Sequence, residues 1–181
     1  MLKKSSFFLI NFLLFNLTAM LCYAQFAEAL QANAAELIPA PIRAPAESRF
    51  VLSTQAKGRQ IYQCQLSGGR YSWSLKAPDA KLMDENGQIV GSHYHGPVWE
   101  YKGGSRVKGR VVNKFDVAQE KAVSWLLVKV IAHQGAGLLA NVHYINRINT
   151  KGGLPPQSGC DTNHLGSEVS IPYSADYLFF E

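Results

Sequence analysis

The strongest constraint on the fold is an alternation of apolar and polar residues with a period of two, which begins at Phe50. In the segment YSWSL, residues 71–75, three large apolar side chains fall on one face and two serines on the other. A β-strand with one buried face produces this pattern, because successive side chains of a strand point to opposite sides. After Phe50 no amphipathic helix of about ten residues or more is expected. The pattern therefore predicts a β domain.

Glycine-rich turns divide this region into short strands. The segment SGGR, residues 67–70, separates strands expected at 60–66 and 71–75. Asn86 and Gly87 are expected to supply the positive φ angles of a second tight turn. Further strands are expected at 98–101, 106–112, 125–132, 139–149 and 168–180. About eight or more short strands with such turns predict an all-β fold, a single antiparallel β-sandwich or barrel-like domain.

The first 24 residues have the order of a secretory signal peptide. Two lysines precede an apolar stretch at 7–21, and cleavage is expected between Ala24 and Gln25. The apolar stretch is shorter than the roughly 20 residues that a membrane-spanning helix needs. An uncleaved membrane anchor is the alternative. We therefore predict export to the periplasm or the extracellular space, with no transmembrane segment in the mature chain.

Residues 25–49 differ in composition from the rest of the chain. They are rich in alanine and contain Pro39, Pro41 and Pro45. Proline favours an extended backbone and has no amide hydrogen to donate. We predict that this segment is a tether that contributes little to the core, and that the β domain comprises residues 50–181.

After removal of the signal peptide, which contains Cys22, the chain would retain Cys64 and Cys160. An even pair of cysteines in an oxidising compartment predicts a disulfide. The alternative is two buried free thiols. A bridge would close a loop of about 95 residues, which on the chain-entropy account stabilises a fold by about 4 to 5 kcal/mol.

The net charge argues against one class of partner. The whole chain carries a formal charge of +5, and loss of Lys3 and Lys4 with the signal peptide lowers it to +3. A charge this small does not indicate a nucleic-acid partner. Arg106, Lys108 and Arg110 alternate along one strand face and suit an acidic polysaccharide or a lipid headgroup. A solvated sheet face is the more common reason for such a stripe.

One motif has the spacing of a dinucleotide site but not its context. Gly135, Gly137 and Ala140 fit G-x-G-x-x-A. In a nucleotide site these residues open a helix, and an acidic residue follows about 20 positions later. Here a segment rich in β-branched residues follows, and the next acidic residue is Asp161. We interpret the glycines as a hairpin turn and expect no cofactor.

Six blocks of the domain occur in a characteristic order: QIYQC, YSWSLKAPDAKL, GSHYHGPVWE, WLLVK, YINRINTKGG and PYSADY. With these blocks the domain resembles a family of secreted bacterial and fungal proteins classed as a domain of unknown function, number 3455. The resemblance runs from about Gly58 to Phe180 and implies export and a single domain, without an activity. The chain departs from the family at His95, where a small residue is usual.

The segment GSHYHGPVWE, residues 91–100, is the candidate site. We expect a strand through His93, a turn at Gly96-Pro97, and a second strand that carries Trp99 and Glu100 to opposite faces. On the structural interpretation this segment is a corner, in which Trp99 fills the core and His93 bonds only to backbone.

On the functional interpretation the same segment contributes to a ligand site. A carboxylate beside an imidazole favours the charged form and raises the pKa of the histidine, which suits proton transfer or an anionic ligand. The residues expected to bind the ligand are His93, Tyr94, Trp99, Glu100 and Arg147.

A metal site would require more than this segment offers. On a strand, His93 and His95 would project to the same side about 6.6 Å apart. Two ligands do not make a site, so His133, His143 or His164 would have to converge on them. We therefore predict no metal site.

Three functions remain, and we rank them by the motifs that support each. A non-catalytic ligand-binding module of the cell envelope or extracellular space comes first, with a small molecule or a carbohydrate as partner. A structural or interaction protein comes second. A hydrolase-type enzyme that uses His93 with Glu100 or Asp79 comes third, because no nucleophile elbow and no paired-carboxylate motif supports it.

Overall fold

Each strand of the domain pairs with its neighbours in sequence, and the last strand pairs with the first. The computed structural model describes residues 38–117 and 121–181, so the signal peptide predicted at 1–24 lies outside the described residues. The chain divides into two units, Met1–Pro39 and Ala40–Glu181, and the second contains all the strands.

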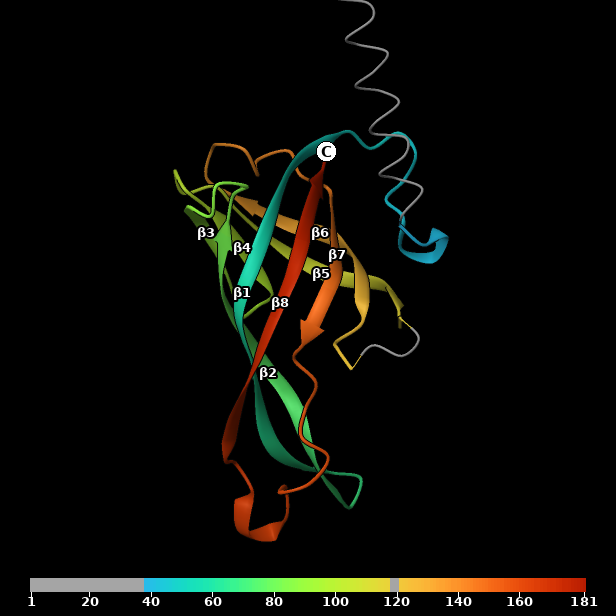
Figure 1. Ribbon diagram of the computed structural model, residues 1–181, viewed down its shortest axis with the longest axis vertical. Coiled ribbons are helices and arrows are strands. Elements are labelled where there is room, and N and C mark those ends of the chain that lie inside the picture. The colour runs from blue at the N-terminus through green and yellow to red at the C-terminus, as the bar shows by residue number, and fades with distance from the viewer. Residues whose placement is uncertain (1–37, 118–120) are drawn as a thin grey trace, which may run out of the picture. The chain divides into compact units, whose positions relative to one another are not determined.

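Eight antiparallel strands close into one barrel in the order β1 to β8 (Figure 1). This confirms the predicted all-β, antiparallel, barrel-like domain. The strands are β1 (Phe50–Ser67), β2 (Arg70–Met83), β3 (Ile89–Tyr94), β4 (Val98–Tyr101), β5 (Arg106–Phe115), β6 (Trp125–Gln134), β7 (Tyr144–Gly152) and β8 (Glu168–Phe180), with short 3-10 turns η1 (Ala40–Ile42) and η2 (Thr162–His164).

Alternate side chains of the strands fill the barrel. In β8, for example, Tyr173, Ala175, Tyr177 and Phe179 are buried, and the residues between them are more exposed. Burial of this apolar surface stabilises the domain, by roughly 25 cal/mol for each Å² removed from water. The core also contains Leu82, Trp99, Val107, Val128 and Ile145.

Three strands extend beyond the barrel. β1, β2 and β8 have 18, 14 and 13 residues, and together they form a three-stranded arm below the barrel (Figure 1). The loop that connects β7 to β8 is tied to this arm by the disulfide between Cys64 and Cys160, whose Cα atoms are 5.3 Å apart. The structure therefore contains the predicted bridge.

Two local expectations are wrong. Only Gly87 has a positive φ, of 76°, in the β2–β3 turn, because the side chain of Asp84 accepts hydrogen bonds from the amides of Asn86 and Gln88 and shapes a longer loop. The strand expected at 139–149 begins at Tyr144. The residues before it form a turn.

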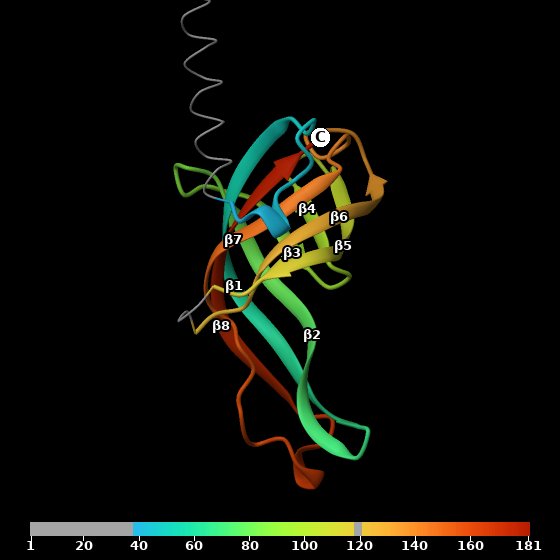
Figure 2. The same ribbon diagram turned by 90° about the vertical axis from the view of Figure 1, so that its right-hand side faces the viewer.

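Part of the segment expected to be a tether packs on the barrel. Ile42, in η1, is fully buried, and η1 lies against β5 and β6 on the outside of the barrel (Figure 2). Asn146 donates a hydrogen bond of 2.6 Å to the carbonyl of Ile42, and Asn113 donates one of 2.5 Å to that of Pro41. Ile42 therefore contributes to the core, whereas β1 begins at Phe50, the predicted start of the domain.

Replacing Ile42 by alanine is expected to lower the free energy of unfolding by about 2 to 3 kcal/mol, because the change removes a buried side chain and leaves a cavity. Urea denaturation of the two proteins measures this difference. Glu47→Ala is the matched control, since Glu47 is exposed in the same segment. Equal midpoints for Ile42→Ala and Glu47→Ala would show that η1 does not hold the barrel together.

Candidate functional site

The segment 91–100 forms the hairpin of β3 and β4. His93 lies opposite Trp99, and Tyr94 lies opposite Val98. The turn between the strands contains Gly96 with a φ of 134°, a conformation that a residue with a side chain rarely adopts. Trp99 is only 2% exposed and packs inside the barrel. The hairpin therefore has the geometry of the expected corner.

His93 lies inside the barrel, stacked on Trp99. Their ring centroids are 4.2 Å apart and the planes differ by 13°. The Nδ1 atom of His93 is 2.9 Å from the carbonyl oxygen of Val98. A carbonyl only accepts, so Nδ1 carries the hydrogen and Nε2 carries the lone pair. Burial lowers the pKa of His93 from 6.5 to about 3, and the ring is therefore neutral at physiological pH.

Glu100 does not meet His93. It pairs with Ser92 in the ladder and points away from the barrel interior, where its carboxylate accepts a hydrogen bond of 2.7 Å from Tyr94. This hydrogen bond raises the pKa of Tyr94. The expectation that Glu100 raises the pKa of His93 is therefore wrong. Asp79 is also outside, with its side chain 62% exposed, so the carboxylate and imidazole of a hydrolase are not brought together.

Arg147 lies opposite Tyr177 in the β7–β8 ladder and reaches the barrel interior. Its charge acts on the buried rings of His93 and Tyr177. Its Nε and Nη2 atoms donate to the carbonyl of Ser124 at 3.1 and 2.8 Å. Arg147 is nevertheless partly exposed to solvent. Among the described residues it forms no ion pair with a carboxylate.

Three tyrosines that the sequence analysis did not select surround this guanidinium. Tyr173 and Tyr177 have their hydroxyl oxygens 3.5 Å apart, and Tyr62 donates a hydrogen bond of 2.5 Å to the carbonyl of Gly153. Burial raises the pKa of all three, and the charge of Arg147 opposes this effect. The phenols therefore remain neutral. The period-two spacing of Tyr173 and Tyr177 in PYSADY was the signal that could have placed them on the same face.

Polar atoms without a partner accompany these rings. Neither side-chain amide atom of Gln60 has a hydrogen-bond partner among the described residues, although Gln60 is only 1% exposed. The same holds for the hydroxyl of Thr54 and the indole nitrogen of Trp99. Gln60 lies beside Gly153: a Cβ atom added to Gly153 would be 3.3 Å from the Cγ atom of Gln60. We call Gln60, Thr54, His93, Trp99, Arg147, Tyr173 and Tyr177 the interior polar cluster.

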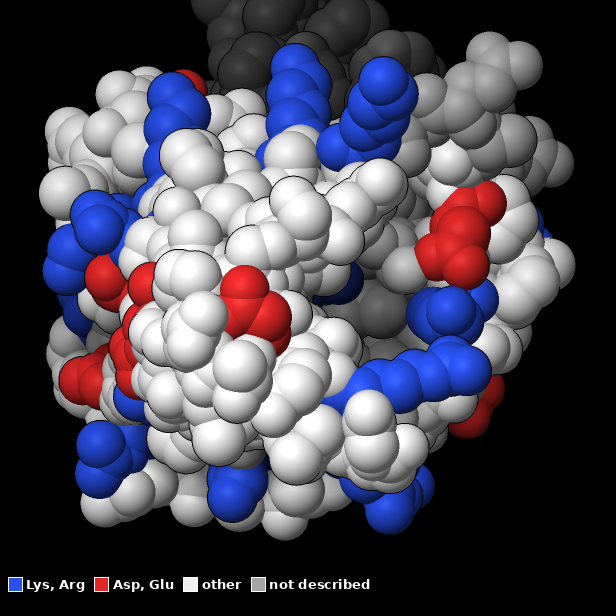
Figure 3. Space-filling model, turned by 90° about the horizontal axis from the view of Figure 1, so that it is seen from below, with Lys and Arg blue, Asp and Glu red and all other residues white. Residues whose placement is uncertain are grey.

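The side of the molecule from which the arm extends is hollowed (Figure 3). Seen from below, the molecule has a hollow with Lys or Arg atoms set back inside it (Figure 3). This view looks onto the end of the barrel from which the arm extends (Figure 1). Arg147, the charged member of the interior polar cluster, is itself partly exposed to solvent.

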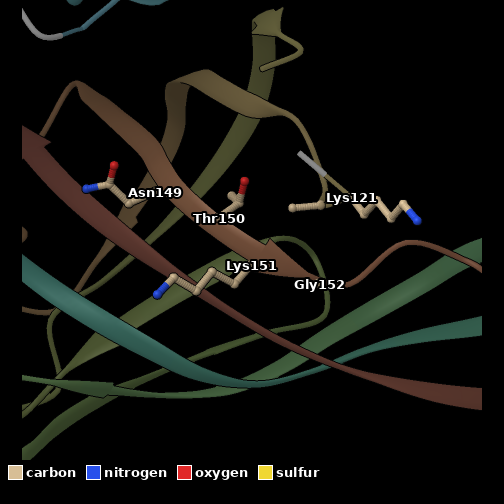
Figure 4. Close-up of a pocket in the computed structure, with 6 residues that line it drawn as sticks. Lys121, Asn149, Thr150, Lys151 and Gly152 are labelled. Atoms are coloured by element: carbon tan, nitrogen blue, oxygen red, sulfur yellow. The ribbon is translucent and has the colours of Figure 1, made fainter. Parts of the chain in front are cut away.

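A second hollow lies beside the end of β7. It has a volume of about 530 Å³ and is lined by Lys121, Ala122, Asn149, Thr150, Lys151 and Gly152. Figure 4 shows the amino groups of Lys121 and Lys151 pointing in opposite directions. The Thr150 hydroxyl already donates to the carbonyl of Val123, and Asn149 donates to Asp176. Its polar groups do not converge, so this hollow is a weaker candidate.

The other polar motifs lie outside the barrel. His95 is exposed in the β3–β4 turn, 3.2 Å from the carbonyl of Lys76, so it shares no face with His93. Across residues 38–117 and 121–181, no three His, Cys, Asp or Glu side chains are placed to hold a metal ion. In the stripe on β5, Lys108 and Arg110 are solvated, and Arg106 donates to Gln134.

Comparison with known proteins gives one match. A model of the family described as "Protein of unknown function (DUF3455)" matches residues 45–181. No curated protein and no solved structure matches the chain. In the part of the chain that the structure describes, no helix has the length and apolar character needed to cross a bilayer.

Proposed function

This chain belongs to the family described as "Protein of unknown function (DUF3455)". Because that description names no activity, we propose a function from the interior polar cluster alone. The protein is a non-catalytic binding module that holds a small molecule inside its barrel. Ligand sites are mostly apolar cavities with a few polar groups that fix the ligand's orientation. The interior of this barrel has that composition.

The observation that carries the proposal is the unpartnered amide of Gln60. Buried polar groups in proteins almost always have hydrogen-bond partners, and leaving one without costs about 1 to 3 kcal/mol. Gln60, Thr54 and Trp99 each carry this cost in the same interior. A site that binds a ligand accounts for it, because binding sites often sacrifice stability for function.

The chemistry of the cluster supports binding over catalysis. His93 is a neutral ring with a pKa of about 3, too low for a general base at physiological pH. Its candidate partners Glu100 and Asp79 lie outside the barrel. The alternative of a structural protein is favoured by the stack of His93 on Trp99, which packs part of the interior. The unpartnered amide of Gln60 counts against that alternative.

We also propose that the protein is exported and works in the periplasm or outside the cell. The disulfide between Cys64 and Cys160 supports this location, because such bridges persist in oxidising compartments and are rare in the cytosol. The predicted signal peptide gives a second reason.

Replacing Gln60 by leucine is expected to raise the free energy of unfolding of the ligand-free protein by about 1 to 3 kcal/mol, since the buried amide no longer lacks partners. The same change is expected to abolish retention of a bound small molecule in native mass spectrometry of the exported protein. Gln65→Leu is the control, because Gln65 is exposed on the same strand. A wild type that retains nothing, together with a Gln60→Leu variant that is no more stable, contradicts the proposal.

A further inference from the structure

The guanidinium of Arg147 is the one charged group of the interior polar cluster. It hydrogen-bonds to the Tyr177 hydroxyl and to a backbone carbonyl, and among the described residues no carboxylate pairs with it. Arginine carries five N–H bonds in a planar fork. Two of them, one on Nε and one on Nη2, are directed to the carbonyl of Ser124. A neutral carbonyl does not balance a positive charge, and a partly buried charge is costly unless it is paired.

From this arrangement we infer that the ligand is a small organic monoanion, whose carboxylate is bound by Arg147 together with the hydroxyl groups of Tyr173 and Tyr177. The inference rests on the proposed function and adds the chemical class of the ligand. A planar guanidinium matches a carboxylate with two parallel hydrogen bonds. The two hydroxyl oxygens lie 3.5 Å apart beside it.

The phenols are suited to an anion because they remain protonated. Burial raises the pKa of Tyr173 and Tyr177, so each keeps an O–H bond that can be donated. The third polar ring, His93, is neutral and adds no positive charge. The cluster therefore combines one cation with neutral donors, which balances one negative charge.

This charge count favours a carboxylate over a phosphate. A phosphate dianion would need a second cation or a charged histidine, and the cluster supplies neither. The lysine and arginine side chains of β5 are on the outside of the barrel. Beside these polar groups, Arg147 lies opposite Leu126, which packs against the core, so one side of its surroundings is apolar. The body of the ligand is accordingly apolar or aromatic.

The test measures binding of benzoate and butyrate to the disulfide-bonded protein by calorimetry and thermal unfolding, with benzamide, butyramide and inorganic phosphate as comparison probes. We expect at least one carboxylate to bind and to raise the unfolding temperature, and the amides and phosphate to bind at least tenfold more weakly. Arg147→Gln is expected to weaken carboxylate binding at least tenfold. Arg59→Gln is the control, because Arg59 is on the barrel exterior near Asp79.

Tyr173→Phe provides a second variant if Arg147→Gln does not fold, because it removes only a hydroxyl group. We expect it to fold and to bind the carboxylate several-fold more weakly. Equal binding of a carboxylate and its amide, or unchanged affinity in both variants, overturns the inference and leaves the binding function standing. If no probe binds, and Gln60→Leu is no more stable than wild type, the inference and the proposed function both fail.

Discussion

Replacing Cys64 and Cys160 by alanine is expected to lower the free energy of unfolding by about 4 to 5 kcal/mol, because a bridge across 96 positions removes much conformational freedom from the unfolded chain. The folded state contributes as well. The bridge holds the β7–β8 loop on the arm, where the other attachments include one hydrogen bond of 2.9 Å from the Trp73 indole to the carbonyl of Ser158. Urea denaturation of the oxidised protein and of the double alanine variant measures the difference.

The control for this prediction separates the bridge from the loss of two side chains. Wild type that has been reduced and alkylated after unfolding should refold with the same loss of stability as the variant. Two thiols that react in the native, exported wild type would contradict both the bridge and the proposed export. A loss below about 1 kcal/mol would show that the loop is held mainly by its hydrogen bonds and not by chain entropy.

Much of the fold could be predicted from the sequence, because a strand with one buried face shows a period of two in the order of its residues. The strands at 98–101 and 168–180 have the bounds that the pattern predicts. Closure of the barrel could not be predicted. It depends on the pairing of β1 with β8 across most of the chain, for example Phe50 with Phe180, and no local pattern encodes that contact.

The same alternation explains why the predicted pairing of Glu100 with His93 is wrong. Trp99 and Glu100 are neighbours on β4, so a Trp99 inside the barrel requires a Glu100 outside it. His93 lies opposite Trp99 and therefore on the inner face. The alternation of side chains therefore places Glu100 and His93 on opposite faces of the sheet. They were assigned to one site only because a shared ligand was assumed.

Gln60 follows the same alternation. Gln60, Tyr62 and Cys64 lie two residues apart along β1, and all three are buried. The polar side chain of Gln60 gave no reason to select it from the sequence, although its parity with Tyr62 and Cys64 places it on the inner face. Leu66 continues this alternation but is 50% exposed, because it belongs to the arm.

His93 is expected to make the protein sensitive to acid. In the folded state burial lowers the pKa of His93 to about 3, and the group next in importance is the carbonyl of Val98, which opposes the shift. In the unfolded chain the pKa is the ordinary 6.5. Between these values the unfolded chain binds a proton that the folded chain does not. The free energy of unfolding therefore falls by roughly 1.4 kcal/mol per pH unit below 6.5, about 4 to 5 kcal/mol in all by pH 3.

The groups around His93 do not reverse this pH dependence of stability. The ring faces Trp99 and Tyr177, which carry no charge at acid pH, and Arg147, whose positive charge further disfavours a protonated imidazole. Among the described residues, no carboxylate contributes to this shift. The stability that His93 contributes is fully present above pH 6.5 and is lost as the pH falls toward 3.

Comparison of wild type with His93→Gln isolates this effect, because the other ionisable groups are common to both proteins and cancel in the difference. The variant should be less stable at pH 7.5, since glutamine cannot stack on Trp99 as the imidazole does, and its stability should fall less steeply below pH 6.5. The gap between the two proteins should narrow by several kcal/mol toward pH 3. His95→Gln, in the exposed turn, should follow the wild-type curve. Parallel curves for wild type and His93→Gln would mean that His93 is not buried in the barrel, and the interior site would lose the ring that lines it.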